Sequence, residues 1–150
     1  MIDSHDYELH LDGTGAKTGV LVDPSAALPA MDVASPPEFG GPEGVWSPEH
    51  LFVGAVSACL MTTFRTIASL SKLDVVDYSD DATGALVRAD DGLYRMERVT
   101  LRPHVVIGPD ASPERAQRLL EKADRACLVS RSVCSEVIVE PTIEVSGAPM

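Results

Sequence analysis

The chain has 150 residues, a formal net charge of −11 and a hydrophobic fraction of 45%, which is an ordinary globular composition. A chain of this length buries roughly 70% of its unfolded surface, so we expect a single domain that covers residues 1–150. The acidic charge disfavours binding to phosphate backbones and to anionic lipid, so neither nucleic acid nor a membrane is an expected partner.

The N-terminus lacks the features of a secretory signal. Its first residues include Asp3, Asp6 and Glu8, and no basic region is followed by an apolar run. The longest nearly apolar run, 51–61, is too short to cross a bilayer. The three cysteines are widely spaced and odd in number, which argues against a secreted disulfide framework. We therefore expect a reduced, cytoplasmic protein.

The first part of the chain predicts a hairpin followed by an irregular segment. Residues 7–11 and 18–22 alternate between polar and apolar side chains, and Asp-Gly-Thr-Gly at 12–15 supplies a turn between them. Prolines and glycines then crowd residues 24–44, which predicts irregular structure.

A long apolar helix is predicted after this segment. Ser47 is the expected N-cap, Pro48 fits the first helical position, and Glu49 is an acid in the first turn. Apolar residues then spread around the helix axis to about residue 70 or 72. A helix that is apolar over so much of its surface must be covered on most sides. Because the chain has only two long helical patterns, we expect a partner subunit as the cover, in an obligate homodimer.

The second half of the chain predicts a long hairpin, a second helix and a last strand. Residues 82–88 and 93–107 are joined by Asp-Asp-Gly at 90–92, a strong hairpin signal. The second helix begins at Ser112, with proline and glutamate behind it, and the last strand covers 137–145. This order predicts an α+β fold in which an antiparallel sheet packs on helices.

Two cysteines on the predicted helices suggest a thiol-based redox site. Cys59 lies inside the apolar helix after the small residues Ser57 and Ala58, and Cys127 lies where the second helix should end. Burial as a small hydrophobic residue is the simpler interpretation of a helical cysteine, and it is the expected one for Cys134. No two cysteines have the close spacing of a zinc site, so we expect neither a metal nor a cofactor.

Glu49 lies ten residues before Cys59. This spacing places it within roughly 80° of the cysteine around the helix axis but about 15 Å away along it. The carboxylate cannot touch the thiol, but it can hold a cation from another segment, and that cation would act on the thiolate.

Several blocks of the sequence resemble those of the OsmC/Ohr family of thiol peroxidases. They are Pro-Glu-Phe-Gly-Gly-Pro at 37–42, Ser-Pro-Glu-His-Leu-Phe at 47–52 with Ala-Cys at 58–59, Arg-Val-Thr-Leu-Arg-Pro at 98–103 and Ala-Cys-Leu-Val-Ser-Arg-Ser at 126–132. The resemblance covers nearly the whole chain in the correct order. Its most specific part is the spacing of the two cysteines.

The resemblance implies an OsmC-like fold, with antiparallel sheets packed around two long central helices in an intertwined homodimer. It implies Cys59 as the peroxidatic thiol, Cys127 as the resolving thiol and Glu49 as the acid that holds an activating arginine. A thiolate of this kind is oxidised to a sulfenic acid, forms a disulfide with the second thiol and is reset by a dithiol reductant. The implied function is reduction of organic hydroperoxides in oxidative stress defence. The alternative is a non-catalytic dimer that binds an apolar ligand, with packing or stress-sensing cysteines.

The arginine of the family has no match in this chain. Its place in the N-terminal hairpin is taken by Lys17, and its place before the glycine pair is taken by Glu38. Lysine supplies a charge but lacks the planar fork that contacts a carboxylate and a thiolate together. Lys17 is therefore the candidate activating cation, and the alternatives are Arg65, Arg125 and Arg131.

Overall fold

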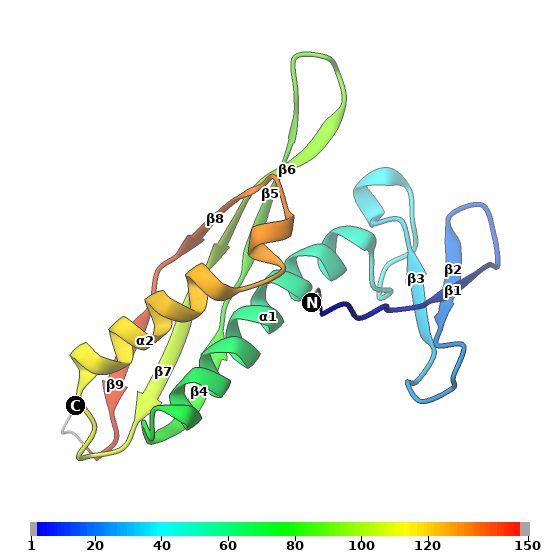
Figure 1. Cartoon of the computed structure of the whole chain (residues 1–150). Coiled ribbons are helices and arrows are strands. Elements are labelled where there is room, and N and C mark those ends of the chain that lie inside the picture. The colour runs from blue at the N-terminus through cyan, green and yellow to red at the C-terminus, as the bar shows by residue number, and fades with distance from the viewer. Residues whose placement is uncertain (1–2, 148–150) are drawn as a thin grey trace. The chain divides into compact units, whose positions relative to one another are not determined.

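The computed structural model describes residues 3–147 of the chain, which divides into two compact units, 1–51 and 52–150. Three strands precede the long helix α1, and four strands, the helix α2 and two last strands follow it (Figure 1). The expected α+β class with two long helices is confirmed. The boundary between the units falls inside the first turns of α1.

The N-terminal unit is built on a three-stranded antiparallel sheet. Strand β2 (Thr18–Val22) lies between β1 (His10–Gly13) and β3 (Met31–Ala34). The predicted hairpin is confirmed, although its first strand begins at His10 rather than at Tyr7. Strand β3 lies in the segment predicted to be irregular. The sequence did not indicate this strand, because it has only four residues and prolines flank it closely.

Helix α1 (Pro48–Leu70) begins where the sequence predicts. The Ser47 hydroxyl accepts a hydrogen bond from the His50 N–H at 3.2 Å, which satisfies one of the unpaired amides of the first turn. The helix is longer than the apolar run 51–61 and, by length and composition, could cross a membrane, a test that core helices of soluble proteins also pass. Only 22% of its most apolar window is buried inside the chain.

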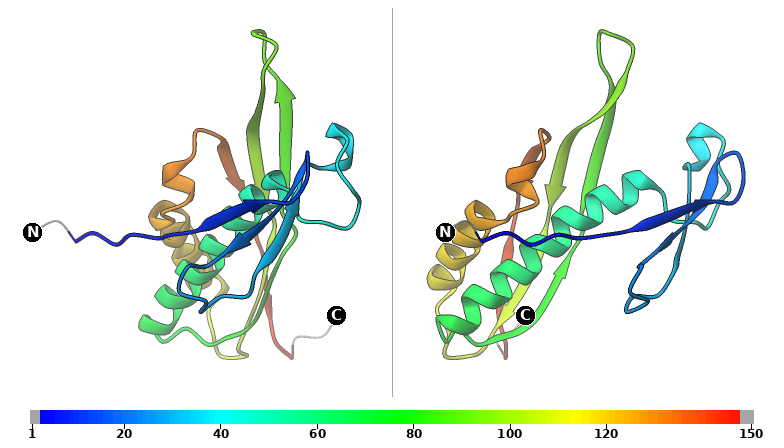
Figure 2. Two further views of the ribbon diagram at one scale, coloured as in Figure 1. Left: turned by 90° about the vertical axis from the view of Figure 1, so that its right-hand side faces the viewer. Right: turned by 45° about the vertical axis from the view of Figure 1, so that its right-hand side comes forward.

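The C-terminal unit carries both helices on the same side of its strands (Figure 2). Two three-stranded sheets, β4–β7–β9 and β5–β6–β8, are formed by three stretches of chain that each continue from one sheet into the other. The elements of this unit are β4 (Val75–Asp80), β5 (Thr83–Arg88), β6 (Tyr94–Leu101), β7 (Pro103–Ile107), α2 (Pro113–Ala126), the 3-10 helix η2 (Ser130–Ser132), β8 (Glu136–Val139) and β9 (Thr142–Val145).

These sheets correct the expectation of an antiparallel arrangement. β5 pairs with β6 and β4 with β7 in antiparallel fashion, but β8 runs parallel to β6 and β9 parallel to β7. Parallel neighbours need a crossover connection, and α2 supplies it. Two predicted strands are each divided in two. The strand predicted at 93–107 is interrupted at Arg102, just before Pro103, and the strand predicted at 137–145 is interrupted at residues 140–141, which include Pro141. A proline has no N–H to donate to the ladder.

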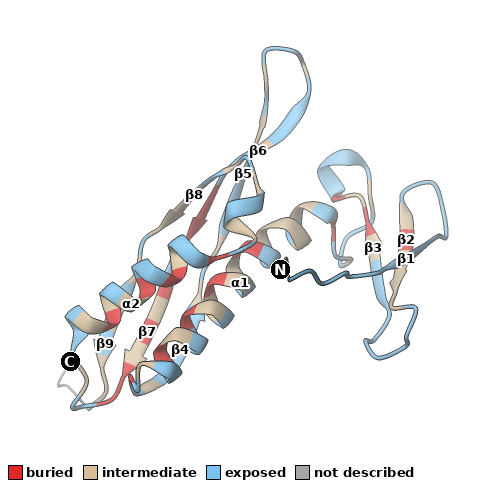
Figure 3. Ribbon diagram, in the orientation of Figure 1, coloured by how far each residue is buried: buried red, intermediate tan, exposed pale blue. Residues whose placement is uncertain are grey.

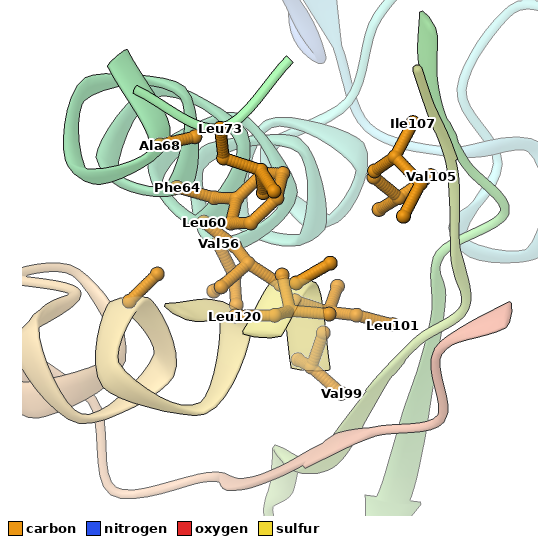
Figure 4. Close-up of a cluster of buried hydrophobic side chains, with 12 residues drawn as sticks. Val56, Leu60, Phe64, Ala68, Leu73, Val99, Leu101, Val105, Ile107 and Leu120 are labelled. Carbon is orange, nitrogen blue, oxygen red and sulfur yellow. The ribbon is translucent and has the colours of Figure 1, made fainter. Parts of the chain in front are cut away.

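One hydrophobic core joins α1, α2 and the middle strands of the C-terminal unit. The inner side of α1 repeats every four residues, as a helix packed along one stripe requires. Buried residues gather on the facing sides of the helices and strands (Figure 3), and Figure 4 shows how their side chains meet. The core comprises Val56, Leu60, Phe64, Ala68, Leu73, Val99, Leu101, Val105, Ile107, Ala116, Leu120 and Ala123.

We expect Phe64→Ala to lower the free energy of unfolding by about 3–5 kcal/mol, because it removes a fully buried ring from this core. Leu70→Ala is the matched control, since Leu70 ends the same helix and is 80% exposed; its cost should stay within about 0.5 kcal/mol. Urea unfolding followed by circular dichroism measures both. Equal effects of the two substitutions would contradict the assigned core.

Candidate functional site

The structure brings Cys59 and Cys127 together. Cys59 lies in the middle of α1, at the border of the buried stripe, and is half-buried; Cys127 caps the C-terminus of α2 and is fully buried. Both thiols are free, and they lie close enough for each to shift the pKa of the other. The two sulfurs therefore lie at one site, as the resemblance to the OsmC/Ohr family implied.

The environment of Cys59 favours its thiolate. Burial raises the pKa of the Cys59 thiol, but hydrogen bonds more than offset this and hold the pKa below its usual value. The donors are the Cys127 thiol, the backbone N–H groups of Val129 and Leu128, and the Thr63 hydroxyl, whose oxygen lies 3.9 Å from the Cys59 sulfur. A thiolate is the reactive form of cysteine, so these surroundings favour the reactive form of Cys59.

The environment of Cys127 has the opposite effect. Burial, followed by the hydrogen bond with Cys59, raises the pKa of the Cys127 thiol, while the hydroxyl and backbone of Ser130 lower it in part. The Ser130 Oγ donates to the Cys127 sulfur at 3.3 Å. The surroundings therefore favour loss of a proton from Cys59 over loss of a proton from Cys127.

A half-buried tyrosine on strand β4, Tyr78, lies within electrostatic reach of Cys127. The Tyr78 ring packs against Phe64 with a centroid separation of 5.9 Å, and its hydroxyl is buried without a hydrogen-bond partner among residues 3–147. Burial, and then the Asp80 carboxylate, raises the pKa of the Tyr78 phenol well above its usual value. Asp80 is itself fixed to α1, because it accepts a hydrogen bond of 2.5 Å from the Ser57 hydroxyl.

The two other predicted site residues belong to the N-terminal unit. The Lys17 ammonium donates to the backbone carbonyl of Phe39, and the Ser35 N–H donates to the Lys17 carbonyl at 3.0 Å. Glu49 lies in the first turn of α1, and its Oε2 is buried with no hydrogen-bond partner in the described part of the chain. The action of Lys17 and Glu49 on Cys59 stays a prediction.

Two of the three arginines considered as alternatives to Lys17 act on other groups. The third, Arg131, lies in η2, where its backbone N–H donates to the Cys127 carbonyl at 3.1 Å, and its action on Cys59 stays a prediction. Arg65 is exposed and lowers the pKa of Tyr78, against the larger effects of burial and Asp80. Arg125 lowers the pKa of Asp124, against the larger effect of burial. The dominant influences on Cys59 are burial and hydrogen bonds.

Sequence reasoning missed the donors that surround the two thiols. The roles of the Leu128 and Val129 backbone amides as donors could not be predicted from the identities of their side chains. Ser130 could have been recognised from the sequence as a donor, because a serine three residues after Cys127 can reach back over a single turn. Cys134 differs from its expected packing role: it is exposed and lines an open cavity of about 640 Å³, together with Phe52, Arg95, Met96, Glu97, Arg98, Ser132, Val133, Ser135 and Glu136.

Comparison with known proteins gives consistent results. Residues 41–142 match the family model described as OsmC-like protein. A relative over nearly the whole length of both proteins, 98% of this chain and 99% of the other, is the uncharacterized protein YmaD of Bacillus subtilis, at 27% identity.

Solved structures of similar proteins share the fold. An OsmC-like protein of unknown function from Vibrio cholerae superposes with a TM-score of 0.80 at 23% identity, over 91% of this chain and 100% of the other. An organic hydroperoxide resistance protein OsmC from Legionella pneumophila superposes with a TM-score of 0.73 at 25% identity, over 95% and 100%. The organic hydroperoxide resistance protein OhrB of Bacillus subtilis gives a TM-score of 0.65 at 21% identity, over 92% and 98%. These structures share the fold, and the family model, which spans most of the chain, establishes that the protein belongs to the OsmC-like family.

Proposed function

We propose that the protein is a thiol-dependent peroxidase that reduces organic hydroperoxides, with Cys59 as the peroxidatic and Cys127 as the resolving thiol. The observation that carries this proposal is the proximity of two interacting thiols whose surroundings lower the pKa of Cys59 and raise the pKa of Cys127. Relatives that are named organic hydroperoxide resistance proteins support the choice of substrate and a role in oxidative stress defence.

The chemistry requires only the two sulfurs, a proton source and an external reductant. The Cys59 thiolate attacks the hydroperoxide, so that an S–O bond forms, the O–O bond breaks, and the alkoxide takes a proton and leaves as an alcohol. Cys127 then attacks the sulfenic sulfur of Cys59. An S–S bond forms and hydroxide leaves as water with the Cys127 proton. A dithiol reductant restores both thiols by exchange.

Lys17 and Glu49 complete the proposed site. The unpaired Oε2 of Glu49 is the acceptor that a cation would satisfy, and Lys17 is the cation that the sequence offers. The resulting pair would lower the pKa of Cys59 beyond what its hydrogen bonds achieve. No metal and no organic cofactor takes part in this proposal.

A second candidate function rests on Lys17. Its ammonium is already bound to the Phe39 carbonyl, and a lysine held in this way is a poorer activator than a free arginine. A non-catalytic OsmC-like dimer that binds an apolar ligand is therefore the alternative. Loss of peroxide consumption in Cys59→Ser separates the two functions, because a binding protein would not consume peroxide at all.

We also propose that the protein acts as a soluble, cytoplasmic homodimer. With 22% of the apolar window of α1 buried inside the chain, a second copy is the natural cover for the remainder.

The redox pair can be tested directly. After one equivalent of cumene hydroperoxide, mass spectrometry should find a Cys59–Cys127 disulfide in the wild type and in the control Cys134→Ser. Cys59→Ser should consume no hydroperoxide, because it removes the nucleophile. Cys127→Ser should consume one equivalent and keep Cys59 as a sulfenic acid that dimedone traps. Wild-type protein with both thiols still free would refute the two-cysteine mechanism.

The activating cation can be identified from the pH dependence of the peroxidase rate. Because the pKa of Cys59 is lowered, the wild-type rate should rise to half of its plateau below pH 8.5, about the usual thiol pKa. Lys17→Met should raise the pH midpoint by about one unit, which corresponds to about 1.4 kcal/mol. Lys17→Arg should keep the peroxidase rate unchanged or increase it. Lys72→Met, an exposed lysine beyond the far end of α1, is the control. An unchanged midpoint in Lys17→Met excludes Lys17 as the cation.

The assembly can be tested by sedimentation equilibrium. We expect one species of about twice the 16.0 kDa chain mass at micromolar concentration, because the exposed apolar surface of α1 would otherwise face water. A stable folded monomer under these conditions would exclude the obligate dimer.

A further inference from the structure

Two hydrogen-bond donors of one residue converge on the buried sulfur of Cys127. The Ser130 Oγ donates at 3.3 Å, and the Ser130 backbone N–H donates to the same sulfur. Ser130 is the first residue of η2, and its neighbour Val129 turns its own N–H toward Cys59 instead. The turn after α2 thus supplies separate donors to the two thiols.

These two donors form only weak hydrogen bonds while Cys127 is protonated. The sulfur of a neutral thiol is a weak acceptor, whereas a hydrogen bond to an ionised group is about twice as strong as a neutral one. Cys127 is fully buried, so its thiolate has no water to stabilise it. The two Ser130 donors therefore reach their full value only when Cys127 carries negative charge.

We propose that Ser130 is a positioning residue that stabilises the thiolate of Cys127 and thereby sets how fast Cys127 closes the disulfide on Cys59. The proposal rests on the proposed function for its biological meaning, because it assigns a residue to the resolving half of that reaction. The Ser130 hydroxyl keeps its own proton throughout. It donates a hydrogen bond to Cys127 as the S–S bond forms, and again if the disulfide is opened at Cys59 and Cys127 leaves as a thiolate.

The groups that titrate near Cys127 are few. The Cys59 thiol faces it from α1, and the Tyr78 phenol lies within electrostatic reach on β4. Burial raises the pKa of Tyr78 far enough to keep the phenol neutral. On α2, the Asp124 carbonyl accepts the Cys127 N–H at 3.3 Å, and burial raises the pKa of the Asp124 carboxyl. In a protein with Cys59 already converted to a disulfide, the rate of closure near neutral and alkaline pH therefore reports on Cys127.

The experiment needs no peroxide. All variants carry Cys134→Ser, so that the exposed third thiol does not react. Excess 5,5′-dithiobis(2-nitrobenzoate) first converts Cys59 to a mixed disulfide and releases one thionitrobenzoate. Cys127 then attacks the Cys59 sulfur, an S–S bond forms, and the second thionitrobenzoate leaves with the electron pair of the broken S–S bond. The rate of this second release is measured by stopped-flow absorbance from pH 6 to pH 10.5.

Ser130→Ala should raise the pH midpoint of the second release by about one unit. Thiolate reactivity rises with thiol pKa by a Brønsted coefficient of about 0.4–0.5. The second release should therefore be about threefold slower at neutral pH and about threefold faster on the alkaline plateau. Ser130→Thr, which keeps the hydroxyl, should restore the wild-type profile.

Ser132→Ala is the matched control, because the Ser132 Oγ donates to the Leu128 carbonyl at 2.7 Å in the same turn and is not a donor to Cys127. It should leave the midpoint unchanged. Ser130→Gly is a second hydroxyl-free variant should the alanine variant fail to fold. A uniform slowing without a shift of the midpoint, or an equal shift in Ser132→Ala, overturns the proposal. This proposal and the proposed peroxidase function can fail independently, because the release of thionitrobenzoate does not depend on hydroperoxide chemistry. The effect of Ser130 can be present in a protein that does not reduce hydroperoxides, and it can be absent from one that does.

Discussion

The packing of α1 along the central strands fixes the position of everything else in the C-terminal unit. Its inner stripe repeats every four residues and meets Val99 and Leu101 of β6 and Val105 of β7 in one core. Because successive helical residues advance by about 100°, Cys59 lies some 60° from Val56 and 100° from Leu60 around the axis. The sulfur therefore lies at the edge of the buried stripe. At this edge the sulfur is partly shielded from water and lies near the residues that follow α2.

The second constraint is the difference between two chemically identical thiols. Cys127 is fully buried and Cys59 only partly, and the amides of residues 128 and 129 are directed at Cys59. Two ionisable groups whose surroundings move their pKa values apart can take different roles in one reaction. In this fold, burial and backbone direction move the pKa values of the two thiols apart.

The sequence specified the parts of the structure that depend on local signals. Ser-Pro-Glu at 47–49 and at 112–114 marked both helix starts, and Asp-Asp-Gly marked the β5–β6 hairpin. It did not reveal β4, whose register depends on long-range pairing with β7 and whose sequence alternates weakly, nor the parallel pairing of β8 and β9. For the site, the two cysteines were predictable from helix position and family resemblance. The amides beside Cys59 were not, because their direction depends on how the turn after α2 closes.

The strands of the C-terminal unit all break at one level. Residues 81–82, Arg102 and residues 140–141 interrupt them side by side, and a few polar contacts cross the interruption: the Arg102 N–H donates to Asp80 at 2.7 Å, and the Arg102 guanidinium pairs with Glu140 at 3.2 Å. The three stretches of chain are therefore interrupted along one line between the two sheets, and bending would concentrate along this line rather than spread over the length of the strands. Asp80, at this line of interruptions, also accepts a hydrogen bond from Ser57, which lies two residues before Cys59 on α1. Movement of one three-stranded sheet against the other would therefore reach α1 near Cys59 through the hydrogen bond between Asp80 and Ser57.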